Sequence, residues 1–147
     1  MERLRAAEKE IERVRVQSLL ARAGALAAEP DDVSGVSFVG YFAEGAAAAE
    51  VRTLALDVRG RMGAERPAVV CVVGAVDGRP SVVVALNDAA RDRGLGAGQL
   101  VRAAARRLGG NGGGKDDVAQ GGGTDATAAQ QAVLQVERAI GQRVTSS

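Results

Sequence analysis

A glycine-rich stretch near the end of the chain, residues 108–125, constrains the fold more than any other sequence feature. It reads LGGNGGGKDDVAQGGGTD and contains no serine, whereas flexible linkers usually mix glycine with serine. Glycine permits positive φ and close backbone approach, so successive N–H groups can form a concave surface that binds anions. We therefore predict a structured anion-binding loop rather than a loose solvent loop. Its two glycine runs enclose four polar residues: Lys115, Asp116, Asp117 and Gln120.

The first 25 residues predict a charged helix that forms an arm. Apolar and small side chains recur at spacings of three and four, as in a coiled coil. This seam can pack on a second protomer, on a preceding helix, or back on the globular part. The break at residues 29–32 separates the arm, residues 1–28, from a globular domain at residues 34–145. The seam comprises Leu4, Ala7, Ile11, Val14, Ser18, Ala21 and Ala25.

The globular part predicts a small α/β domain, with helices flanking a mixed sheet. Alternating side chains at residues 36–42 indicate a strand. The spacing of apolar residues at 51–62 indicates a helix with one apolar face. Two apolar runs, 68–73 and 81–86, form a hairpin around Asp-Gly. A polar loop at 87–96 then leads to a helix at 97–108. A capping box at Thr127–Gln130 begins the last helix, which buries Ala129, Val133, Val136 and Ile140.

Composition excludes many reactions. The chain contains no histidine and one cysteine, Cys71, which lies in an apolar run and is expected in the core. Neither a histidine base nor a zinc site of cysteine and histidine can be assembled, so we expect no catalysis and no cofactor in this chain alone. The single cysteine and the lack of a signal-like N-terminus favour a soluble cytoplasmic protein. No apolar run approaches the roughly 20 residues that cross a bilayer.

Charge is unevenly distributed, although the formal net charge is only +1. Residues 29–50 contain acids without a base. Only two lysines accompany seventeen arginines, and one of them, Lys115, lies in the glycine stretch. A basic face on a near-neutral protein suits salt-sensitive phosphate binding, although it can also be an ordinary solvated helix face. Residues 91–107 provide that face with Arg91, Arg93, Arg102, Arg106 and Arg107.

Three nucleotide or metal motifs are incomplete. Gly109–Lys115 matches the glycine spacing of a P-loop, but Asp116 replaces the Ser/Thr that holds Mg²⁺, and a helix precedes it. Gly94–Gly98 has the wrong spacing for a dinucleotide fingerprint. Asp116 and Asp117 have no third metal ligand in view, so we expect them to shape a turn and accept hydrogen bonds from loop amides.

The aromatic content excludes a stacking platform for single-stranded RNA. Phe38, Tyr41 and Phe42 are the only aromatic residues, and alternation directs both phenylalanines to the core. A platform of that kind needs several exposed rings. Nucleic-acid contact would therefore rest on arginines, loop amides and shape, which suits a folded RNA.

Three segments resemble the C-terminal domain of alanyl-tRNA synthetase, which belongs to the DHH-associated group shared with DHH phosphoesterases. They are Ala97–Val101, Gly109–Lys115 and Ala119–Gly123, followed by the closing amphipathic helix. The likeness extends over nearly the whole chain. The phosphoesterase branch usually carries histidine in this loop, which is absent here, so a related phosphoesterase would lack its metal ligands.

The resemblance implies a non-catalytic module that contacts the elbow of alanine tRNA and couples aminoacylation to editing. Its partners would be the catalytic and editing domains of a parent enzyme, which would hold ATP, Mg²⁺ and Zn²⁺ elsewhere. The alternatives are a module that oligomerises or docks the same enzyme through the N-terminal helix, and a freestanding nucleic-acid-binding paralogue. In some members the arm oligomerises, which here implicates Leu4, Ile11 and Val14 in a homodimer. The family loop corresponds to Gly112, Gly113, Gly114, Lys115, Gln120, Gly121, Gly122 and Gly123, with electrostatic support inferred from position at Arg91, Arg93, Arg102 and Arg106.

Overall fold

The computed structural model describes residues 2–145, and at residues 2–6, 12, 15–16, 19–20 and 145 only the backbone. A six-stranded mixed sheet organises this part of the chain, which confirms the expected fold class. β2 and β3 are parallel, and the other neighbouring strands are antiparallel. The strand order is β1 (Asp31–Val33), β2 (Val36–Glu44), β3 (Ala68–Val76), β4 (Arg79–Leu86), β6 (Val118–Gly122) and β5 (Gly112–Gly114).

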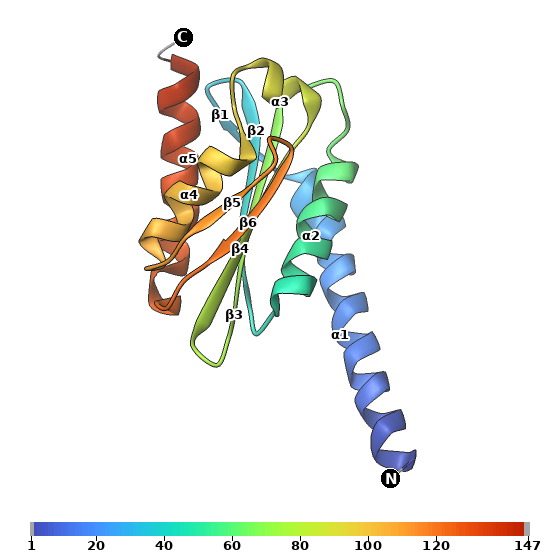
Figure 1. Cartoon of the computed structure of the whole chain (residues 1–147). Coiled ribbons are helices and arrows are strands. Elements are labelled where there is room, and N and C mark those ends of the chain that lie inside the picture. The colour runs from blue at the N-terminus through green and yellow to red at the C-terminus, as the bar shows by residue number, and fades with distance from the viewer. Residues whose placement is uncertain (1, 146–147) are drawn as a thin grey trace.

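Helices cover both faces of the sheet (Figure 1). α2 (Ala48–Arg61) packs on β3 and β4 from one side, and the long α1 (Glu2–Ala28) packs beside α2. α4 (Ala97–Arg107) packs on β4, β5 and β6 from the other side, and α5 (Ala129–Thr145) packs on β2 and β3 beside it. None of the helices in the described part is long and apolar enough to span a bilayer.

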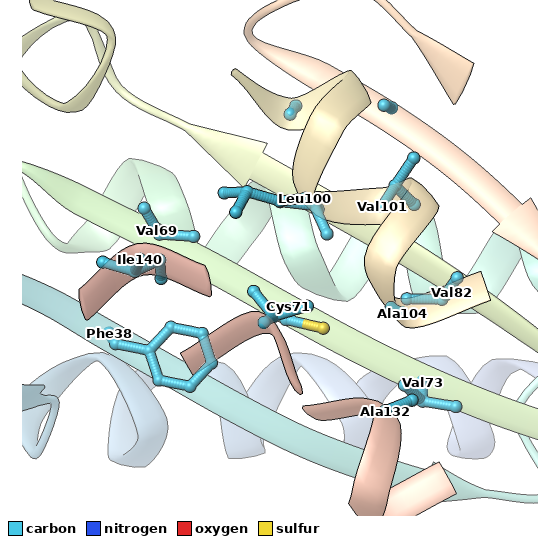
Figure 2. Close-up of a cluster of buried hydrophobic side chains, with 14 of the residues drawn as sticks. Phe38, Val69, Cys71, Val73, Val82, Leu100, Val101, Ala104, Ala132 and Ile140 are labelled. Atoms are coloured by element: carbon cyan, nitrogen blue, oxygen red, sulfur yellow. The ribbon is translucent and has the colours of Figure 1, made fainter. Parts of the chain in front are cut away.

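The two faces of the sheet carry separate hydrophobic clusters. β3 is apolar at nearly every position because its alternate side chains enter opposite layers: Val69 and Cys71 face α4 and α5, whereas Val70 faces α2. Cys71 is completely buried among apolar side chains (Figure 2), and burial raises its pKa to about 12. This confirms that Cys71 belongs to the core. Phe38 is buried and Phe42 packs against the same cluster, as expected.

The β3–β4 hairpin is confirmed, with strands longer than the apolar runs that predicted it. Val76 pairs with Arg79, so the turn contains only Asp77 and Gly78. Both turn residues have positive φ, 51° and 76°, as a type I′ turn requires. Pairing therefore continues beyond the apolar runs, as far as the exposed residues Val76 and Arg79 beside the turn.

The expected polar loop at 87–96 contains a short helix, α3 (Asp88–Asp92). Asn87 begins it, because its side-chain Oδ1 accepts a hydrogen bond from the Ala90 N–H at 3.0 Å. The same Asn87 oxygen also accepts from the N–H of Ala68, at the start of β3. The sequence did not predict this helix because the segment is polar and the helix is only five residues long.

The predicted capping box at Thr127–Gln130 is wrong. Asp125 caps this end instead, accepting a hydrogen bond from the Thr127 N–H at 3.1 Å. A 3₁₀ turn, η1 (Ala126–Ala128), then leads directly into α5. Aspartate and threonine are both good caps, and the tight 3₁₀ turn moves the cap two residues toward the N-terminus.

The arm helix packs on the domain, but not through the predicted seam. Ala23 is fully buried toward α2, and Leu26 and Ala27 pack against the same cluster. At about 100° per residue, Ala23 lies about 140° around the helix from Ser18 of the seam. The side chain of Leu4 is outside the described residues. Every other seam residue is exposed: Ala7, Ile11, Val14, Ser18, Ala21 and Ala25.

Candidate nucleic-acid interface

The glycine-rich stretch forms a hairpin at the edge of the sheet rather than a loop. β5 pairs with β6, which pairs in turn with β4, so β5 is the edge strand. Consecutive N–H groups of an extended strand point to opposite sides. The predicted concave surface of successive N–H groups is therefore not formed along Gly112–Gly114. Pairing with β6, whose other edge pairs with β4, accounts for the extended conformation of these residues.

On the α4 side, the absence of side chains allows the backbone to pack closely. A Cβ added at Gly110 would overlap the Gly122 carbonyl oxygen, and one at Gly123 would overlap the Leu108 carbonyl oxygen. A Cβ at Gly112 would lie 3.1 Å from Cγ1 of Val101 in α4. Glycines at these positions are explained by packing alone.

Gly113 differs from the other glycines of the hairpin. A Cβ added there would meet no atom within 4 Å, and its φ is not in the left-handed region. Its register partner is Gln120, so the two positions share one face of the hairpin, turned away from α4. Neither packing nor backbone conformation requires glycine at residue 113.

This face borders a depression of about 310 Å³. We name it the open face and define it by the lining residues. Two cations, Lys115 and Arg52, lie in it, and Arg52 comes from α2. The guanidinium Nη1 of Arg52 donates a hydrogen bond to Oε1 of Gln120 at 3.2 Å. The open face consists of Arg52, Gly113, Gly114, Lys115, Asp117, Val118, Ala119 and Gln120.

The turn that carries Lys115 is held by main-chain hydrogen bonds. The Lys115 N–H donates to the Val118 carbonyl oxygen at 3.1 Å, and the Ala97 N–H at the start of α4 donates to the Asp116 carbonyl oxygen at 2.9 Å. The Asp117 carboxylate accepts from the Val118 N–H at 3.0 Å. The expected role of Asp117 in the turn is thus confirmed, and Lys115 projects from a fixed backbone.

Arg59 of α2 fixes the turn to the sheet. Its Nη1 donates to the carbonyl oxygens of Leu86, at 3.3 Å, and Asp117, at 3.4 Å. The Leu86 N–H also donates to the Asp117 carbonyl oxygen at 2.8 Å. No three His, Cys, Asp or Glu side chains gather as metal ligands anywhere among the residues described.

The structure brings only part of the predicted site together. Gly113, Gly114, Lys115 and Gln120 line the open face. Gly112, Gly121 and Gly122 make close backbone contacts within and beside the hairpin.

The predicted arginines lie apart from the open face. Arg102 and Arg106 are exposed on α4, which covers the opposite face of the sheet from α2. Arg91 is exposed in α3 and pairs with Asp88 at 3.2 Å, and Arg93 is exposed immediately after α3.

Arg52 was not predicted from the sequence. It is separated from Gln120 by 68 residues and is an ordinary exposed arginine of an amphipathic helix. No local motif distinguishes it. The only signal available was the requirement that a helix between parallel strands packs back on their sheet.

Comparisons with known proteins cover most of the chain. Residues 35–142 match the DHHA1 domain family. The alanine–tRNA ligase of Nocardioides sp. (strain ATCC BAA-499 / JS614) is 58% identical over 141 residues, covering 96% of this chain and 16% of that ligase. The alanine–tRNA ligase of Thermobifida fusca is 52% identical over 139 residues, covering 94% of this chain and 16% of that ligase. The chain thus spans a small part of the length of these relatives.

Solved structures share the fold. The C-Ala domain of alanyl-tRNA synthetase from Aquifex aeolicus superimposes with a TM-score of 0.69 at 24% identity, covering 77% of this chain and 98% of that one. RecJ from Thermus thermophilus, in complex with Mg²⁺, superimposes with a TM-score of 0.58 at 19% identity. That match covers 91% of this chain and 20% of RecJ. At these identities the likeness concerns the fold alone.

Proposed function

Because the chain belongs to the DHHA1 domain family, we propose that it is the tRNA-binding C-terminal module of an alanine–tRNA ligase. The resemblance to the C-terminal domain of alanyl-tRNA synthetase is confirmed by the sequence relatives and the fold. We propose that the module binds the elbow of alanine tRNA. As part of such a ligase it would act in the cytoplasm, beside catalytic and editing domains that use ATP, Mg²⁺ and Zn²⁺.

The open face is the observation that carries this proposal. Lys115 and Arg52 bring two positive charges to it, and its one carboxylate, Asp117, already accepts a hydrogen bond from a main-chain amide. Gly113 has no structural need to be glycine, and the missing side chain lets a sugar–phosphate backbone approach the strand closely. Positive charge and room for close approach, without aromatic rings on which bases could stack, suit contact with the outer surface of a folded RNA.

Holding the elbow would help to couple aminoacylation to editing. The acceptor end has to move between two catalytic sites while the rest of the tRNA stays attached. A contact far from that end keeps the effective concentration of the acceptor end high during the transfer. The exposed arginines of α4, Arg102 and Arg106, and those around α3, Arg91 and Arg93, would add long-range attraction for the polyanion from the neighbouring surface.

The proposal is tested by titrating the chain with folded alanine tRNA and an unfolded RNA of equal length at two salt concentrations. We expect preference for the folded RNA and weaker binding at the higher salt, with a modest slope that reflects a few phosphate contacts. Gly113→Val should weaken binding of the folded RNA while leaving the melting temperature unchanged. Equal binding of both RNAs, or no binding, would remove the elbow assignment.

A second candidate function is self-association through the arm, which the exposed seam favours. Ile11 is 66% exposed and Val14 is 54% exposed, while another face of α1 packs on α2. Large apolar side chains repeated along an exposed helix face are typical of a coiled-coil interface.

The double variant Ile11→Gln, Val14→Gln should abolish a concentration-dependent dimer in sedimentation equilibrium, because it removes the apolar contacts of the seam. Val76→Gln is the matched control, since Val76 is 41% exposed on the β3–β4 hairpin, away from the arm. A wild-type chain that stays monomeric at every accessible concentration would rule out this function.

A further inference from the structure

Arg52 is the one residue that α2 contributes to the open face. Its side chain is exposed at the edge of the depression that Lys115 also lines. It makes no ion pair with any carboxylate in the described part of the chain. The second positive charge of the open face is therefore not neutralised within the described domain.

Gln120 holds this arginine in place through one hydrogen bond. The bond between Nη1 of Arg52 and Oε1 of Gln120 is 3.2 Å long, and it uses one of the five N–H donors of the guanidinium. The remaining donors can form the paired hydrogen bonds that guanidinium makes with phosphate. An amide oxygen orients the group without cancelling its charge, which a carboxylate would do.

Gly113 leaves the space beside this pair empty. It is the cross-strand partner of Gln120 on the same face, where a side chain would normally stand next to the glutamine. No atom lies within 4 Å of the position its Cβ would occupy. A phosphate placed over Gly113 would thus have Arg52 and Lys115 among the residues bordering the same depression.

We infer that Arg52 is a phosphate-binding residue for the RNA backbone and that Gln120 is its positioning residue. This inference rests on the proposed function, since it names a contact made by the same open face. It adds to that face a residue from outside the glycine-rich stretch and a role for Gln120 other than direct RNA contact.

The test measures the affinity of the full chain for folded alanine tRNA over a series of salt concentrations. Arg52→Gln should weaken binding about tenfold at low salt and make the slope of log K against log salt shallower by about 1. Arg52→Lys should recover the slope, because it restores the charge, but only part of the affinity. Arg61→Gln is the matched control on the same helix, where Arg61 pairs with Asp57 at 3.3 Å outside the open face.

A double-mutant cycle separates positioning from direct contact. Gln120→Ala should weaken binding about threefold in the wild-type chain, and it should have no further effect in Arg52→Gln. An independent loss in that background would overturn the role of Gln120. If the wild-type chain binds and Arg52→Gln matches Arg61→Gln in affinity and slope, the role of Arg52 is wrong while the proposed function stands. A wild-type chain that does not bind folded tRNA overturns both.

Discussion

Gly123→Ala is expected to lower the free energy of unfolding by at least about 3 kcal/mol. The added methyl would overlap the carbonyl oxygen of Leu108 at the C-terminal end of α4. That oxygen also accepts hydrogen bonds from the N–H groups of Thr124, at 2.8 Å, and Asp125, at 2.9 Å. Moving residue 123 away from Leu108 would strain the segment that connects β6 to α5. Thermal unfolding should show a melting temperature lower by about 6–12 °C.

Gly113→Ala is the control for this prediction, because it adds the same methyl to the same hairpin. No atom lies within 4 Å of the new group, so stability should change by less than about 0.5 kcal/mol. Equal losses in the two variants would mean that the hairpin needs glycine for backbone freedom rather than for packing. A stable Gly123→Ala protein would show that the end of α4 can move aside.

Lys115→Glu is expected to weaken binding of folded alanine tRNA by at least about tenfold at low salt. The substitution replaces a cation by an anion at the tip of the hairpin, on a turn fixed by the hydrogen bonds of Asp116 and Asp117. Since the turn is held through its main chain, we expect the fold to be unchanged. The loss should become smaller as salt rises, because screening weakens the repulsion.

The chain provides its own control in its other lysine. Lys9→Glu makes the same change in net charge on the exposed arm, and it should alter the affinity by no more than about twofold. Similar losses in both variants would indicate attraction by overall charge and no defined contact at the hairpin. Wild-type binding by Lys115→Glu would place the RNA elsewhere.

The glycine-rich stretch shows where interpretation of the sequence was incomplete. Its composition correctly marks a structured segment, but from the sequence alone both glycine runs, Gly112–Gly114 and Gly121–Gly123, are assigned to one anion-binding loop. In the structure, Gly110, Gly112 and Gly123 allow close backbone packing, whereas Gly113 faces solvent. The same residue type therefore has two explanations within one hairpin, and only the positions of the surrounding atoms distinguish them.

The arm shows the same limit in a different form. Its helical character followed from the sequence, and so did the spacing of the seam. Small residues occur around most of the second half of the helix, so spacing alone did not identify the face containing Ala23 as the one that meets α2.

The sequence by itself determined the helices and strands that carry a clear apolar pattern, the burial of Cys71 and Phe38, and the Asp77–Gly78 turn that reverses the chain. These properties depend on apolar periodicity and on the conformational preferences of neighbouring residues, which are local. Only the tertiary structure decided that β5 and β6 extend the sheet and that Arg52 meets Gln120 across 68 residues. Such contacts depend on which distant elements pack together, and the choice of partner leaves no periodic signal in the sequence of either element.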